Sequence, residues 1–105
     1  MKLHDIAIAR SGDKGNLATL SVIALDAADY PHIERVLSAE RVRAFFDGIV
    51  RGEVERFALP HLGALHFVMH DALAGGVTRS LALDAHGKTL AAALLDLELQ
   101  APAAR

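Results

Sequence analysis

Apolar residues fall into two runs near the N-terminus, residues 3–9 and 17–25, with one short polar segment between them. The second run contains β-branched residues in a loose period-two pattern, and the first is apolar apart from Asp5. Short runs of this kind predict strands. Because the segment that joins them is short, we expect the two strands to pair antiparallel.

The next third of the chain has the spacing of helices. Pro31 stands where a first helical turn tolerates a missing N–H, and an apolar i, i+3, i+4 pattern follows at Ile33, Val36 and Leu37. A second helix is predicted to begin after a Ser38 cap and to end at Gly52. Its apolar stripe consists of Val42, Phe45, Phe46, Ile49 and Val50.

The remaining elements are predicted to be mostly strands. Residues 54–59 read as a strand that stops at Pro60, and residues 63–71 alternate as a half-buried strand in which Leu65, Phe67 and Met69 face one side. Residues 78–83 predict another strand, followed by a turn at 84–87. Residues 89–99 fit a helix or a strand, and their run of alanines favours the helix.

Composition describes an ordinary small globular chain. With 105 residues, 52% hydrophobic residues and a net charge of −2, we expect one α+β domain over residues 1–100 and a short flexible tail at 101–105. Cysteine is absent, which excludes disulfides and thiolate ligands. No run reaches the length of a membrane span or a signal peptide, so we expect a cytoplasmic protein without membrane contact.

The polar segment between the first two strands, residues 10–16, is the most informative feature. It consists only of polar residues and glycine: Arg10, Ser11, Gly12, Asp13, Lys14, Gly15 and Asn16. Three interpretations stay open. The loop can be an anion nest for a phosphate, a carboxylate or a CoA pyrophosphate. It can be a contact element for a partner protein. It can also be a tight structural turn that Asp13 caps.

Known motifs identify no cofactor and no reaction. The Walker and dinucleotide patterns are missing, and the Gly-x-x-Gly of residues 12–15 lies between predicted strands in an acidic chain, which argues against nucleic acid. His66 and His70 would lie about 13 Å apart along a strand, too far for one metal ion. The strongest charged constellation joins Asp13 and Lys14 with Arg79, provided that Gly75 and Gly76 turn that strand toward the loop. Whether the chain is an enzyme stays open.

Four blocks in order give the chain a family resemblance. They are the segment 10–16, Leu-Pro-His-Leu with Ala-Leu-His-Phe-Val at 59–68, Gly-Gly-Val-Thr-Arg-Ser-Leu at 75–81, and Asp84 with Gly-Lys-Thr-Leu at 87–90. Together they resemble the C-terminal domain of the acyclic terpene utilisation protein AtuA, in a stand-alone form. His61 and His66 depart from the asparagines expected there, so no role of those amides is carried over.

The resemblance implies a ferredoxin-like fold, an antiparallel sheet with helices packed on one face. It also implies an accessory or regulatory module that docks on an AtuA-like large subunit in acyl-CoA or terpenoid catabolism. The polar segment 10–16, with its two glycines, and Arg79 would lie at the contact. The alternative is a binding site for a CoA ester or another anionic metabolite, built from the same loop in a homo-oligomer. Exposed sheet edges in a short chain favour such self-association.

Overall fold

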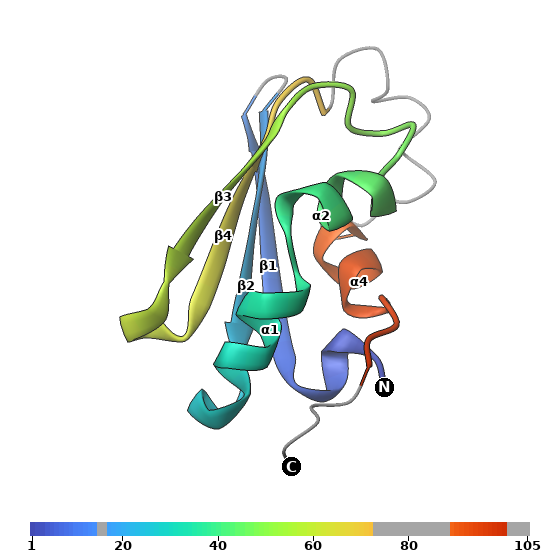
Figure 1. Cartoon of the computed structure of the whole chain (residues 1–105). Helices are drawn as coiled ribbons and strands as arrows, with labels where there is room; N and C mark the ends of the chain where they lie inside the picture. The colour runs from blue at the N-terminus through green and yellow to red at the C-terminus, as the bar shows by residue number, and fades with distance from the viewer. Residues whose placement is uncertain (15–16, 73–88, 101–105) are drawn as a thin grey trace.

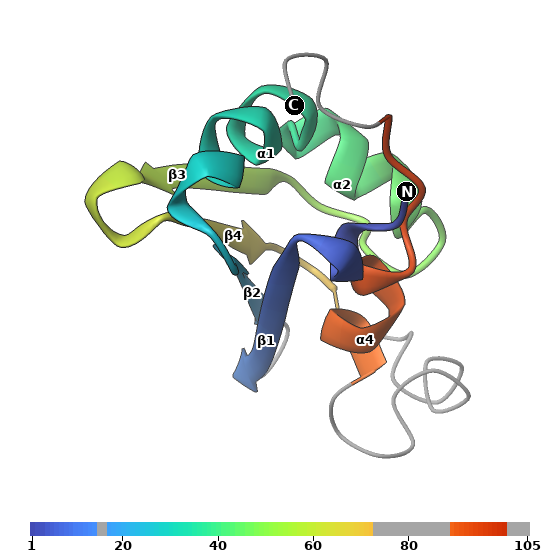
Figure 2. The same ribbon diagram turned by 90° about the horizontal axis from the view of Figure 1, so that it is seen from below.

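The computed structural model describes residues 1–14, 17–72 and 89–100. Its strands β1 (Ala7–Lys14), β2 (Leu17–Ala24), β3 (Val54–Leu59) and β4 (Ala64–Met69) form a four-stranded antiparallel sheet in the order β1-β2-β4-β3. The helices α1 (Tyr30–Val36), α2 (Ala39–Phe45) and α4 (Thr89–Leu95) lie on one face of that sheet (Figures 1 and 2). This is the expected α+β arrangement.

The first strand begins and ends later than predicted. Residues 3–5 form a 3-10 helix, in which the Asp5 carboxylate accepts a hydrogen bond of 2.9 Å from the backbone N–H of Lys2. The strand then continues through most of the polar segment, because the ladder with β2 runs from Ala7 to Lys14. The prediction of a connector at 10–16 was therefore wrong for residues 10–14. Polar side chains are tolerated there, since an antiparallel sheet can leave one face to solvent.

The second predicted helix starts where expected and ends early. Ser38 caps α2, but the helix stops at Phe45 and residues 46–49 form turns, with Gly48 at a φ of +89°. Gly52, predicted as the helix end, instead lies against the residue that follows β4, where its N–H donates to the carbonyl of His70 at 3.0 Å. The shorter helix still buries Val42, and Phe46 and Val50 remain in the core beyond its end.

Loss of the Ser38 cap should destabilise the protein modestly. The Oγ of Ser38 accepts a hydrogen bond from the backbone N–H of Arg41 at 3.0 Å, which satisfies one of the open donors of the first turn. We expect Ser38→Ala to lower the free energy of unfolding by about 1 kcal/mol in a urea titration. Ser38→Asp keeps an acceptor and serves as the control. Equal losses in both variants would show that the cap is not the cause.

The later predictions hold where the structure describes them. The predicted strands at 54–59 and 63–71 are β3 and β4, joined by a 3-10 helix at Pro60–Leu62. The ambiguous C-terminal element is the helix α4, and the backbone of Leu97 beyond it bonds to Leu3 at 2.9 Å. The predicted strand at 78–83, the turn at 84–87 and the tail at 101–105 lie outside the described residues.

The hydrophobic core lies between the sheet and the helices. The two central strands supply a row of side chains that are at most 1% exposed: Leu20 and Val22 of β2, and Leu65, Phe67 and Met69 of β4. Ile33, Val42 and Leu94 of the three helices are equally buried. Alternate residues of the strands therefore face the helices, and the residues between them face the opposite side.

Candidate functional site

The side of the sheet opposite the helices, here called the open face, has no described element packed over it (Figure 2). The strand registers place one set of residues on it. That set comprises Ile8, Arg10 and Gly12 of β1; Leu17, Thr19, Ser21 and Ile23 of β2; Ala64, His66 and Val68 of β4; and Glu55, Phe57 and Leu59 of β3. Any contact made by this face is made with something other than the described elements.

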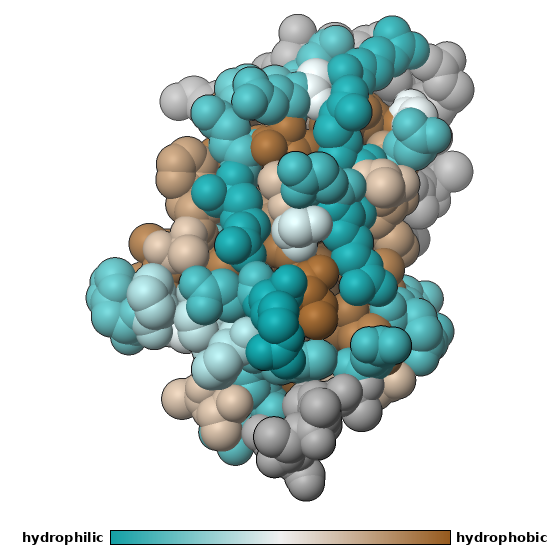
Figure 3. Space-filling view, in the orientation of Figure 1, coloured by the Kyte–Doolittle hydropathy of each residue, from teal (hydrophilic) through white to brown (hydrophobic). Residues whose placement is uncertain are grey.

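The open face exposes more apolar surface than a solvated sheet requires. Phe57 is 48% exposed and Ile8 is 43% exposed, on the two edge strands. Residues Ile23, Leu59 and Val68 lie half-buried between them. The other side of the molecule, formed by α1 and α2, is mainly hydrophilic in Figure 3. Of the large apolar side chains that are exposed in the described residues, Leu25, Leu62 and Phe45 lie outside the strands, and Ile8 and Phe57 are the two on the open face. Exposed apolar side chains on a sheet face are typical of an interaction surface.

A polar row crosses the middle of this face. The row consists of Arg10, Ser21 and His66, because Arg10 pairs with Ser21 and Ser21 pairs with His66. Phe57 of β3 pairs with His66 and lies at the same level, at the end of the row. The Oγ of Ser21 and the Nδ1 of His66 form a hydrogen bond of 2.8 Å. Both side chains are half-buried, whereas Arg10 is exposed. The bond fixes the imidazole against β2 and directs its Nε2 away from Ser21.

The opposite edge of the open face carries negative charge. The carboxylate of Glu55 on β3 lies 3.0 Å from the Nε2 of His70, just beyond β4. Arg10 lies on the other edge strand, β1. Arg10 is exposed and Glu55 is half-buried. The open face therefore carries a positive group at its β1 edge and a negative group at its β3 edge.

The candidate residues of the polar segment separate between the two faces. Arg10 and Gly12 lie on the open face, while Ser11 pairs with Leu20 and belongs to the helix-covered face. The backbones of Asp13 and Lys14 belong to β1 and pair with Ala18 and Leu17. The other candidates, namely Gly15, Asn16, Gly75, Gly76 and Arg79, lie outside the described residues, as does the constellation of Asp13 and Lys14 with Arg79.

Sequence reasoning missed three residues of this face, Ser21, Phe57 and His66. In the sequence Ser21 is predicted only as part of a strand, and His66 only as a candidate metal ligand and as a departure from the family's asparagine. The missing signal was the register. A prediction that extended the first strand to Lys14 and began the second at Leu17 would have paired these two residues. The same register pairs Arg10 with Ser21.

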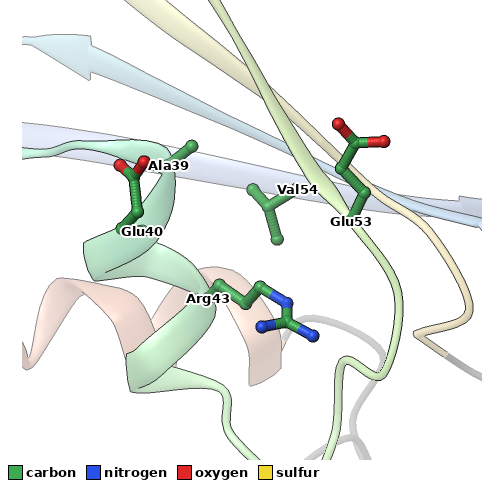
Figure 4. Close-up of a pocket in the computed structure, with 5 residues that line it drawn as sticks. All are labelled: Ala39, Glu40, Arg43, Glu53 and Val54. Carbon is green, nitrogen blue, oxygen red and sulfur yellow. The ribbon is translucent and has the colours of Figure 1, made fainter.

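A hollow between α2 and the start of β3 is a weaker candidate (Figure 4). It has a volume of about 310 Å3 and is lined by Ala39, Glu40, Arg43, Glu53 and Val54. Arg43, the one cation among the described residues that line it, already donates to the carbonyl of Gly52 at 2.8 Å. The guanidinium of Arg43 is already hydrogen-bonded, and the other charged groups of the hollow are the carboxylates of Glu40 and Glu53. We therefore assign no function to this hollow.

The described residues offer no metal site and no membrane helix. No group of three or more His, Asp or Glu side chains in residues 1–14, 17–72 and 89–100 could hold a metal ion. None of the helices in these ranges has the length and hydropathy needed to cross a bilayer.

The pKa of Tyr30 is raised, first by its burial and then by the nearby Glu34 carboxylate, so this side chain is a neutral phenol on the helix side of the sheet.

Comparison with known proteins places the chain in a family. The family model described as the AtuA ferredoxin-like domain matches residues 1–100, which is nearly the whole chain. No curated protein and no solved structure matches it. The match agrees with the observed architecture, since helices cover one face of a four-stranded antiparallel sheet. The chain therefore belongs to the AtuA ferredoxin-like domain family and has the ferredoxin-like fold.

Proposed function

We propose that this protein is an accessory module that docks its open face on an AtuA-like large subunit acting in acyl-CoA or terpenoid catabolism. The observation that carries the proposal is the apolar open face, with Phe57 and Ile8 exposed on its two edge strands. The choice of partner rests on the family. The C-terminal module that this chain resembles is joined to a large domain in its relatives, and a module that occurs separately can dock on the same surface of that domain.

Burial of the open face would contribute to the driving force for docking. Covering one large apolar side chain completely contributes about 1.5–3 kcal/mol, and Phe57 and Ile8 are each roughly half-covered already. The half-buried Ile23, Leu59 and Val68 add further apolar area between them. Aromatic side chains are frequent hot spots of binding interfaces. Phe57 is therefore the expected anchor.

The charge pattern would set the orientation of the docked partner. Arg10 at the β1 edge favours an acidic group on the partner, and Glu55 at the β3 edge favours a basic one. A partner rotated by half a turn on the sheet would bring like charges together. In this proposal the polar row and the edges supply specificity, and the apolar residues supply most of the affinity.

The test is co-purification of this chain with the AtuA-like large subunit of the same organism. We expect the native chain to be retained and Phe57→Asp to lose at least about tenfold in affinity, because a carboxylate would be desolvated at the anchor position. Phe45→Asp is the matched control. Phe45 is 37% exposed on α2, in the helix layer, and its substitution should leave retention unchanged.

Two outcomes would overturn the proposal. One is retention of Phe57→Asp at the native level, and the other is loss of retention in Phe45→Asp alone. Light scattering of the isolated chain tests a different occupant, a second copy of the chain. A native dimer that Phe57→Asp converts to a monomer, without any binding of the large subunit, would assign the open face to self-association and contradict docking.

A further inference from the structure

The polar row on the open face combines three groups that recognise anions. Arg10, Ser21 and His66 lie at one level on three adjacent strands, and directly opposed residues of antiparallel strands have Cβ atoms about 5 Å apart. The guanidinium offers a planar fork of N–H donors that matches a carboxylate or a phosphate. Because the Oγ of Ser21 and the Nδ1 of His66 share one hydrogen bond, the pair keeps one donor for an anion, at the Nε2 of His66 or at the Oγ of Ser21 according to the tautomer.

The donors of this row are available to a ligand. Among the side chains that the structure describes, none forms an ion pair or a hydrogen bond with the guanidinium of Arg10. The only described partner of the His66 imidazole is Ser21, at Nδ1, and no described residue bonds to its Nε2. The hydrogen bond of 2.8 Å holds both side chains in place before any ligand arrives.

The backbone beside Arg10 is accessible because the next residue of β1 on the open face is Gly12. A side chain at this position would face Thr19, since a Cβ there would lie 3.2 Å from the Oγ1 of Thr19. A glycine inside a strand often marks the close approach of a ligand or another chain. Here the absence of a side chain at Gly12 lets the Oγ1 of Thr19 lie close to the backbone of β1, beside Arg10.

On the side of the polar row away from Gly12, the next set of paired open-face residues is entirely apolar. It consists of Ile8, Ile23, Ala64 and Leu59, which pair across the four strands in that order. Phe57 closes the polar row at the β3 edge. The two levels are about 7 Å apart, the distance spanned by two residues of a strand. A ligand with its charged end on Arg10 would therefore lay an apolar body over Ile8 and Ile23.

We propose that Arg10, Ser21 and His66 form a binding site for an amphiphilic anion, a small molecule with a carboxylate or phosphate head and an apolar body. This site corresponds to the anionic-metabolite alternative of the sequence analysis. It lies in the middle of the open face, and of the polar segment 10–16 it uses Arg10. Nucleic acid is disfavoured because the chain has a net charge of −2 and so lacks the basic surface that binds phosphate backbones.

The site does not depend on the docking proposal, because the isolated chain already holds all three groups. A docked subunit would close over the row, so the ligand and the subunit should influence each other's affinity reciprocally. The experiment below uses this chain alone. Its failure would leave the docking proposal standing, and a failure of co-purification would leave this site standing.

The test is a titration of the full chain with octyl phosphate, octanoate and the neutral octanamide, followed by 1H–15N spectra. We expect saturable shifts at Arg10, Ser21 and His66 with at least one of the two anions. Arg10→Gln should weaken that binding about tenfold or more, as expected for the loss of a charge-assisted hydrogen bond. Ser21→Ala should weaken it less. Arg51→Gln removes an exposed arginine outside the sheet and should leave the affinity unchanged.

The comparison of ligands identifies the chemistry. Tighter binding of octyl phosphate than of octanoate assigns a phosphate head, and the reverse order assigns a carboxylate. Acetate and inorganic phosphate, which lack the apolar body, should bind more weakly than the octyl compounds. The proposal is overturned if neither anion gives saturable shifts in the row, if octanamide binds as tightly as the anions, or if Arg10→Gln binds like the native chain.

Discussion

Phe67→Ala is expected to lower the free energy of unfolding by about 3–5 kcal/mol, enough to unfold a marginally stable domain. Phe67 is 0% exposed on the central strand β4, paired with Leu20 and Arg56, and it faces the helices. Truncation removes the ring from the core and leaves a cavity that the sheet cannot close by itself. Urea or thermal unfolding followed by circular dichroism measures the loss.

Phe57→Ala is the matched control, because it makes the same substitution on the open face. Phe57 pairs with His66, the residue next to Phe67, and is 48% exposed. We expect a loss below about 1 kcal/mol, since half of its surface is already in water. If both variants lost the same stability, the assignment of the two sheet faces would be wrong. A large difference supports an open face that is retained for contacts outside the fold.

Gly52→Ala is expected to cost about 1–3 kcal/mol, although alanine is usually a mild substitution. A Cβ at Gly52 would lie 2.6 Å from the carbonyl oxygen of His70 and 2.9 Å from its carbonyl carbon. These are backbone atoms, and the N–H of Gly52 donates to the same carbonyl at 3.0 Å. The methyl group therefore forces the segment before β3 away from the end of β4. Thermal unfolding of the variant measures this cost.

Gly12→Ala provides the contrast for that prediction. Its Cβ would meet only the Oγ1 of Thr19, at 3.2 Å, and a side chain can rotate where a backbone carbonyl cannot. We expect Gly12→Ala to lose less stability than Gly52→Ala. Stability losses in the opposite order would contradict the close approach at Gly52.

The sequence predicted most elements because their local signals agree with their tertiary positions. Ser38 caps α2 as expected, and Leu65, Phe67 and Met69 alternate along β4 and are buried. The errors came where tertiary pairing overrides composition. Residues 10–14 look like a loop because they are polar or glycine, yet β2 supplies a full ladder for them. Gly52 looks like a helix end, but its lack of a side chain serves the contact with His70.

The candidate site could be predicted only in part for the same reason. Arg10 stood out because charge beside glycine is conspicuous in a sequence. Ser21, Phe57 and His66 lie 11 to 56 residues further on and join Arg10 only through three strand registers, so no local pattern shows the row. The direction of the open face also depends on which side the helices cover, and this is a property of the whole fold.

The most direct test of docking through the open face is a cross-saturation measurement on the methyl-labelled chain in complex with the AtuA-like large subunit. We predict that saturation reaches the methyl groups of Ile8, Ile23, Leu59 and Val68 on the open face. The exposed Ala44 of α2 and Ala92 of α4 should stay unaffected, since both belong to the helix layer. Saturation of Ala44 and Ala92, with the open-face methyl groups unchanged, would contradict the account.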